Sequence, residues 1–348
     1  MPASPIHTVH EALDARFTDF GGWTMPVQYT GVIDEHTAVR TSSGVFDVSH
    51  LGRFEVSGPG AQGLVRRQLC NDISKVEPGR AQYTMALNER GGIEDDIIVW
   101  WLEGERFWVM PNGTNSTEIF ERFKTDAPEG VAVSDVRAAT TLLAVQGPDA
   151  PSVVGSVLGE APGRFRVTGI SFEDTAGWAA GTGYTGERGA EICVPNEVAA
   201  GLWNALVDAG ATPCGLGSRD TLRLEMGYPL WGQDLDESTT PLEAGLGWVV
   251  AWDHDFVGLG ALEAQRGNLT RKLVAFTTEG RAIPRHGYGV TTTTGSGSVT
   301  SGNFSPSLQH GIGLAYVSPP PAEDDEITIE IRGKQVAAAR SSLPFIER

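Results

Sequence analysis

Short apolar runs separated by turn residues dominate this chain and predict many β-strands. Glycine supplies 44 of the 348 residues and stands between such runs, which is typical of strands joined by tight turns. Two β-hairpins are predicted in this way. Residues Ile97 to Leu102 and Arg106 to Met110 flank the turn 103–105, and residues Ile327 to Arg332 and Gln335 to Ala339 flank Gly333-Lys334.

Helical spacing of apolar residues is less frequent than strand alternation. One helix is predicted after the start signal Ser4-Pro5, with Ile6, Val9 and Leu13 at helical spacing. A second is predicted after Asn196, with Val198, Leu202 and Leu206 at the same spacing. From Lys272 onward the pattern consists of alternating strands, glycine-rich turns and a run of three prolines at 319–321. These features predict a mixed α and β protein with a separate all-β C-terminal domain.

Length and composition indicate an ordinary globular protein with two or three domains. The hydrophobic content of 40% is enough for sizeable cores, and no run approaches the ~20 apolar residues that span a bilayer. The first residues contain no apolar signal region. We therefore expect no membrane association and a cytoplasmic location.

The formal net charge of -18 argues against a nucleic-acid partner, because phosphate binding needs clustered Lys and Arg. Arginine is more common than lysine, which suits bidentate recognition of carboxylates. Cys70, Cys193 and Cys214 are too far apart in sequence for a metal motif, and buried, inert thiols are expected. The histidines show no metal-binding spacing, and the stretch GSGSVTSG lacks the setting of a phosphate loop, so neither a metal nor a nucleotide is predicted.

Three segments contain candidate polar groups. Asp95 and Asp96 open an apolar strand, and because successive side chains point to opposite faces, at most one of them belongs to a site. In GYTGERGAEICV, Glu191 faces away from Ala190, Ile192 and Val194. In GLGSRDTLRLE, two arginines lie one helical turn apart. Turn capping for Asp96, exposure to water for Glu191 and surface ion pairing for the arginines remain open alternatives.

Several segments, taken together and in order, resemble one family. They are DFGGW, GVFDVSH, GGIEDD, GYTGERGAE, GLGSRDTLRLE and VTSGNFSP, and the resemblance runs from about Ile6 to Phe345. The family is the T protein of the glycine cleavage system, the folate-dependent aminomethyltransferase. The resemblance implies an α+β cloverleaf of three domains, two of them interleaved with antiparallel sheets and the third a C-terminal barrel or jelly-roll-like domain, around a central folate channel. The implied bounds are 1–50 with 138–237, 51–137 with 238–270, and 271–348.

The resemblance also implies roles for individual residues. Asp96 matches the essential aspartate beside the reactive folate nitrogen, Glu191 the acceptor of the pterin 2-amino and N3–H groups, and Arg219 the ligand of the folate glutamate tail. The remaining cofactor-binding positions are Tyr83, Asn112, Tyr184 and Tyr228, each of which could instead pack in a core or turn. Glu187 and Arg223 are expected to be structural, and His50 to be a structural residue at a strand end or a pocket wall.

The implied activity is transfer of the one-carbon unit from the aminomethylated lipoyl arm of H protein to tetrahydrofolate, which gives 5,10-methylenetetrahydrofolate and ammonia. A monomer that meets H protein transiently is expected. A folate-dependent demethylase and a non-catalytic folate-binding protein are alternatives, although the KGCYxGQE-like motif of the latter is absent. Departures from the family pattern are Leu51, Pro111, Ser218 and Trp231, of which Pro111 and Trp231 could reshape the channel mouth.

Overall fold

The computed structural model describes residues 1–280 and 282–348 and contains both helices and strands. The chain divides into two compact units, each made of two segments. One unit comprises residues 1–84 and 96–219, and the other comprises residues 85–95 and 220–348. The mixed α+β class predicted from the sequence is confirmed, whereas the three predicted domain boundaries stay a prediction.

Helices and strands are interspersed along the chain as far as Gln265, and the elements described after that residue are strands. The α-helices are α1 (His7–Ala12), α2 (Val32–Thr41), α3 (Ala61–Gln68), α4 (Ser116–Thr125), α5 (Ala150–Leu158), α6 (Asn196–Asp208), α7 (Leu216–Glu225) and α8 (Leu259–Gln265). Short 3-10 turns are η1 (Ile73–Lys75), η2 (Arg137–Ala139) and η3 (Gly247–Val249). No helix in the described part of the chain is both long enough and apolar enough to cross a membrane.

Strands form antiparallel sheets with one parallel pair. β1 (Arg16–Phe20) pairs with β2 (Trp23–Gln28). A six-stranded sheet has the order β10-β11-β12-β9-β3-β13; its strands are β3 (Gly44–Asp47), β9 (Thr140–Gln146), β10 (Val167–Phe172), β11 (Thr175–Ala180), β12 (Gly189–Pro195) and β13 (Thr212–Pro213). A five-stranded sheet has the order β5-β6-β7-β4-β8; its strands are β4 (Phe54–Ser57), β5 (Arg80–Leu87), β6 (Ile93–Glu103), β7 (Arg106–Met110) and β8 (Ala132–Asp135). Among the strand pairs whose register is described, β13 runs parallel to its neighbour, β3, and the others are antiparallel.

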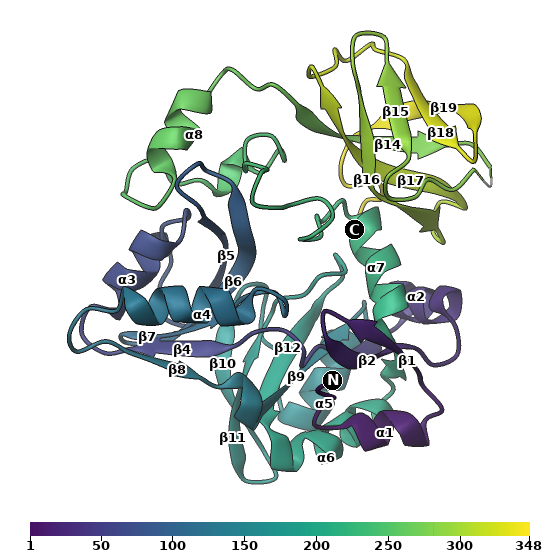
Figure 1. Cartoon of the computed structure of the whole chain (residues 1–348). Helices are drawn as coiled ribbons and strands as arrows, with labels where there is room; N and C mark the ends of the chain where they lie inside the picture. Colours follow the sequence, from purple (N-terminus) through teal and green to yellow (C-terminus); the bar gives the residue numbers. More distant parts are fainter. Residues whose placement is uncertain (281) are drawn as a thin grey trace. The chain divides into compact units, whose positions relative to one another are not determined.

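The core under the six-stranded sheet explains why α6 forms where the sequence predicts it. Val198, Leu202 and Leu206 recur at helical spacing and are buried with α5 against one face of the sheet (Figure 1). The same face contains Ala190, Ile192 and Val194 of β12, as alternation predicts. The first predicted helix is shorter than expected: α1 ends at Ala12, and Leu13 is exposed.

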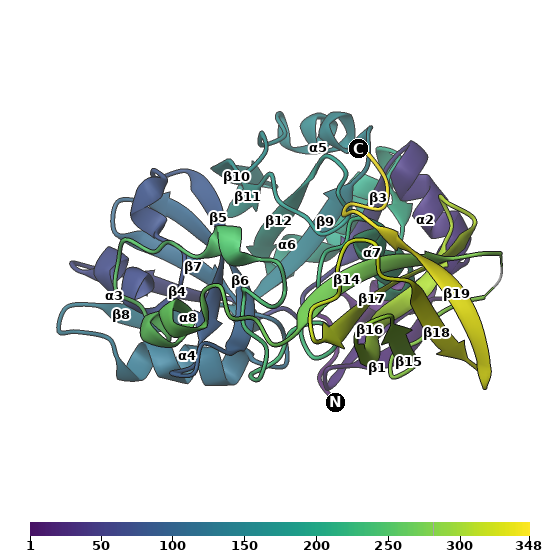
Figure 2. The ribbon, with the colours of Figure 1, turned by 90° about the horizontal axis from the view of Figure 1, so that it is seen from above.

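The C-terminal segment closes into a six-stranded barrel, in agreement with the predicted all-β domain (Figure 2). Its strands are β14 (Lys272–Thr278), β15 (Gly289–Thr292), β16 (Ser296–Ser305), β17 (His310–Ser318), β18 (Ile327–Ile331) and β19 (Lys334–Ser341). The predicted hairpin is present, but its turn lies one residue earlier than the predicted Gly333-Lys334, because Ile331 pairs with Lys334. Its two turn residues, Arg332 and Gly333, have φ of 52° and 75°. Positive φ at both central residues is the geometry of a tight hairpin turn.

The first predicted hairpin also forms, as β6 and β7. In the first half of β6, from Ile93 to Ile98, burial alternates from residue to residue, so that Asp95 is fully buried and Asp96 is partly exposed. The two carboxylates therefore point to opposite faces, as predicted. β5, β6 and α7 each pass from one unit to the other within a single element.

Candidate functional site

The carboxylate of Asp96 is held by two neighbouring side chains of the same unit. The phenol of Tyr83 on β5 donates to Oδ2 at 3.0 Å, and the amide of Asn112 donates to Oδ1 at 2.9 Å. Asn112 also donates to the backbone carbonyl of Asp96 at 3.2 Å. Each oxygen thus has a separate donor, which orients the carboxylate without neutralising its charge.

Tight backbone packing positions Asn112 at the end of β7. The amide of Gly52 donates to the carbonyl of Pro111 at 2.8 Å. On the other side of Asn112, a Cβ on Gly113 would lie 2.5 Å from the carbonyl oxygen of His50, so only glycine fits there. The His50 turn therefore supports the loop that presents Asn112 to Asp96.

A second polar cluster in the same unit contains Glu191 and Arg219. Glu191 of β12 is only 7% exposed and accepts a hydrogen bond from the Thr182 hydroxyl. This burial rules out the alternative of a glutamate that simply faces water. The Arg219 guanidinium lies 4.7 Å from the ring centroid of Tyr184. Burial lowers the pKa of Arg219, and the charge of Glu191 opposes this shift.

Arg219 has an unsatisfied donor inside this cluster. Its Nη1 is buried and has no hydrogen-bond partner among the described residues. A buried donor of this kind is costly unless an acceptor occupies the space beside it. The alternative of surface ion pairing therefore does not apply to Arg219. Arg223 pairs with Asp220 and Asp234, both at 2.9 Å, but its side chain is buried, so this is not a surface pair either.

The two clusters lie within electrostatic reach of each other. Burial raises the pKa of Tyr83 well above its ordinary value, with further contributions from Asp96 and from Tyr184. Tyr184 in turn stacks on Arg219. Six of the seven predicted site residues thus belong to one unit, in two neighbouring groups. Tyr228 belongs to the other unit, where its carbonyl accepts from Arg223 at 3.0 Å.

Comparison with known proteins gives the same family as the sequence segments. Residues 6–254 match the GCVT N-terminal domain, and residues 271–347 match the glycine cleavage T-protein C-terminal barrel domain. The chain belongs to the glycine cleavage T-protein family. An aminomethyltransferase from Frankia alni is 43% identical over 99% of this chain and 97% of its own length. One from Synechococcus elongatus is 44% identical over 99% and 95%, respectively.

A solved structure supports the same assignment. The crystal structure of the glycine cleavage system aminomethyltransferase T from Bartonella henselae matches with a TM-score of 0.91 and 34% sequence identity. The match covers 99% of this chain and 98% of that one. As a T protein, the chain is an aminomethyltransferase that uses folate as a substrate.

Glu187, predicted to be structural, and Ser218, a departure from the family pattern, both make hydrogen bonds within this T protein. Glu187 pairs with Arg40 at 2.8 Å, and Arg40 also donates to the Thr185 carbonyl, so that the turn before β12 is fastened to α2. Ser218 donates to Glu35 at 3.3 Å and to the Gly215 carbonyl at 2.9 Å. Its hydroxyl thus makes hydrogen bonds immediately before Arg219.

His50 is buried, and Arg219 is among the charged groups near it. It is 4% exposed, its ring packs edge-on against Phe20 at 5.0 Å, and its Nδ1 has no partner among the described residues. Burial, followed by the charge of Arg219, lowers the pKa of His50 to about 3. Smaller effects come from Asp47, Arg53 and Arg137. The imidazole is therefore neutral near neutral pH.

We predict that His50 makes folding sensitive to mild acid. Its folded pKa of about 3 lies below the ordinary 6.5, so the unfolded chain binds a proton that the folded chain does not as the pH falls from 6.5 toward 3. Stability is lost across this window. His50→Gln should reduce the slope of unfolding free energy against pH, measured by urea denaturation between pH 4 and 7. His310→Gln is the control, because it also removes one imidazole. Equal slopes in the wild type and His50→Gln would contradict the prediction.

Proposed function

We propose that this T protein transfers the methylene carbon of an aminomethyl group, bound to the lipoyl sulfur of H protein, to tetrahydrofolate. The C–S and C–N bonds of the donor break, and the carbon forms new bonds to N5 and N10 of the folate. The hydrogens from N5 and N10 go to the departing nitrogen and sulfur. The products are ammonia, dihydrolipoyl H protein and 5,10-methylenetetrahydrofolate, so atoms and electrons balance without an added oxidant or reductant.

The observation that supports this proposal best is the doubly held carboxylate of Asp96. Tyr83 and Asn112 fix its orientation, and as neutral donors they add no opposing charge. A fixed negative charge stabilises positive charge that develops on the folate nitrogen or on the transferred carbon. Holding both reactants beside it lowers the entropic barrier, by up to about 7–11 kcal/mol in favourable model systems. Orientation and electrostatic stabilisation are the first role of Asp96, and proton acceptance is the second.

The chemistry of the second cluster fits a pterin ring. The two oxygens of a carboxylate match two parallel N–H donors, and Glu191 is buried with one hydroxyl donor from Thr182. The pterin 2-amino group and N3–H supply two such donors. Tyr184 supplies an aromatic face beside the same cluster. We therefore assign Glu191 to the pterin and Tyr184 to stacking, and we retain Tyr228 as a further folate contact.

Arg219 completes the proposed folate site as a donor. Folate offers two kinds of acceptor, the ring carbonyl and the carboxylates of the glutamate tail. The tail is the partner that the family pattern implies. The influence of Glu191 on the buried guanidinium supports the ring carbonyl, because that oxygen lies next to N3–H. Binding of tetrahydropteroate, which lacks the tail, separates the two partners.

H protein is the proposed donor partner, met transiently by a monomer. Curated relatives named aminomethyltransferase, similar over nearly their whole length, favour this donor over the small methyl compound of a demethylase. A non-catalytic folate-binding role would not require the Asp96 arrangement. The proposed location remains the cytoplasm, and no nucleic-acid partner, metal or nucleotide is proposed.

The proposal predicts turnover that depends on both substrates and on Asp96. Wild-type protein should release ammonia and form methylenetetrahydrofolate from aminomethyl-loaded H protein and tetrahydrofolate, but not from unloaded H protein. Asp96→Asn should lower kcat about 100-fold or more while the folate Kd stays within about threefold, because the amide keeps the shape but loses the charge. Glu94→Gln on the same strand is the control. Folate binding by the wild type without turnover would overturn the aminomethyltransferase proposal.

The second prediction concerns affinity rather than turnover. Glu191→Gln and Arg219→Ala should each weaken tetrahydrofolate binding about 10- to 100-fold, because each removes a charged hydrogen-bond partner from a buried site. Isothermal titration calorimetry measures this effect, with Glu197→Gln on the exposed first turn of α6 as the control. Unchanged affinity in both variants would remove this cluster from the folate site.

A further inference from the structure

Ile93 is the first residue of β6, the strand that contains Asp96. Both its backbone N–H and its backbone carbonyl form hydrogen bonds. The amide of Ile93 lies 2.9 Å from the carbonyl of Thr239 and 3.2 Å from that of Asp236. Its carbonyl accepts a hydrogen bond from the indole Nε1 of Trp231 at 3.2 Å. Ile93 is completely buried and lies three residues before Asp96.

The turn before Ile93 packs closely on the same partner segment. Asn88 donates to the carbonyl of Glu237 at 2.9 Å, and a Cβ on Gly92 would lie 1.8 Å from that carbonyl oxygen. Only glycine permits this approach. The loop around residues 231–239 thus determines where β6 begins, and Trp231 is the side chain of that loop that reaches the strand carbonyl.

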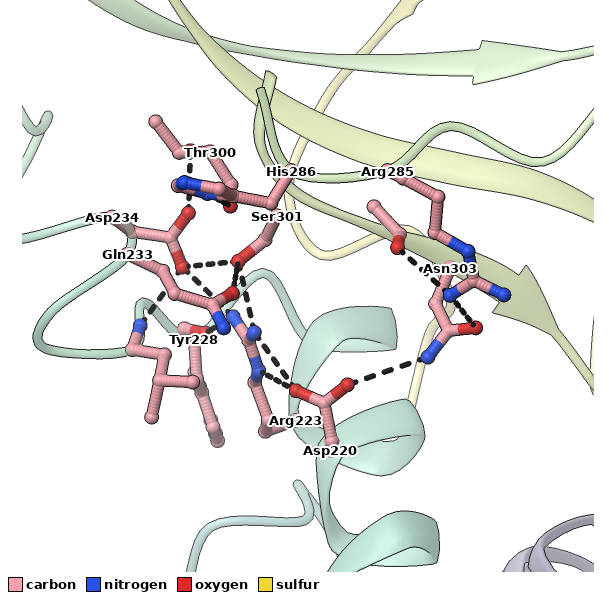
Figure 3. A network of polar contacts seen from close by, with 12 residues as sticks. Asp220, Arg223, Tyr228, Gln233, Asp234, Arg285, His286, Thr300, Ser301 and Asn303 are labelled. Carbon is pink, nitrogen blue, oxygen red and sulfur yellow. Dashed lines mark hydrogen bonds and ion pairs between the residues drawn. The ribbon is translucent and has the colours of Figure 1, made fainter. Parts of the chain in front are cut away.

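Trp231 is itself presented by a loop with a buried ionic anchor (Figure 3). Arg223 donates to Asp234 at 2.9 Å and to the carbonyl of Tyr228 at 3.0 Å. Asp234 also accepts from the amide of Leu230 at 2.9 Å and the hydroxyl of Ser301 at 2.7 Å. Because Arg223 and Asp234 are essentially inaccessible to water, these bonds have few competitors and the loop 228–235 has one defined conformation.

We infer that Trp231 is a positioning residue for the transfer reaction. Its indole N–H fixes the position of the Ile93 carbonyl. Because Ile93 and Asp96 lie on the same continuous strand, this hydrogen bond also limits the movement of Asp96. The Arg223–Asp234 pair holds the loop from which the indole projects. This inference rests on the proposed function, because it takes Asp96 as the group beside the reacting atoms. It also gives a structural role to Trp231, one of the departures from the family pattern.

The test compares Trp231→Phe with Trp252→Phe, the loss of another partly buried tryptophan, which stacks on Arg266 instead. Loss of the Trp231 hydrogen bond should lower kcat roughly 3- to 10-fold with little change in the KM for tetrahydrofolate. Hydrogen exchange of the amides at the start of β6 should become faster in this variant. The Trp252 variant should match the wild type in all three measurements. Trp231→Tyr is the second variant if the phenylalanine variant does not fold.

Two results would overturn the inference. One is a Trp231→Phe protein with wild-type kcat and wild-type exchange in β6. The other is a joint change of kcat, KM and Tm, which would indicate general destabilisation rather than positioning. Failure of the proposed function is distinguishable from both, because the wild type would then show no turnover with loaded H protein, while the exchange measurement would still report the Trp231 contact.

Discussion

Burial of carboxylates is the physical constraint on which this structure depends most. An ionised carboxylate away from water must be hydrogen-bonded, and this strongly acidic chain buries several. Glu35 accepts from the amides of Tyr29 and Gly215, and Asp47 accepts from His10 and from the amide of Ser49. The bonds from Gly215 and His10 connect segments that are far apart in sequence, whereas those from Tyr29 and Ser49 are local. The buried acids therefore fix both local turns and contacts between distant segments.

Asp96 and Glu191 follow the same rule. Asp96 is held by two side chains, and Glu191 accepts from Thr182, while a buried nitrogen of Arg219 has no partner among the described residues. Two carboxylate acceptors and one buried guanidinium donor therefore belong to the same unit. A ligand with both N–H donors and carbonyl acceptors, such as a pterin, complements this arrangement. The scaffold acids have their hydrogen bonds supplied by the protein, and in the proposed site the buried Nη1 of Arg219 is a donor that a substrate could use.

Local sequence patterns predicted the parts of the structure that local physics determines. Alternation separated Asp95 from Asp96 and placed Ile192 opposite Glu191, and helical spacing predicted α6. The first helix was shorter than predicted, because Leu13 is exposed and does not extend the buried face of α1. The contact between Trp231 and Ile93 joins residues 138 positions apart, and no spacing rule reveals such a pair. The burial of Arg219 and the perturbed pKa of His50 likewise depend on packing between distant segments.

The central claim is that one site in this T protein places folate between Asp96 and the Glu191–Arg219 cluster. A crystal structure of the complex with 5-methyltetrahydrofolate, a stable analogue of the acceptor, tests it most directly. The account predicts the pterin 2-amino group about 3 Å from the Glu191 carboxylate, with N5 directed toward Asp96. A pterin bound elsewhere, with neither carboxylate in contact, would contradict it.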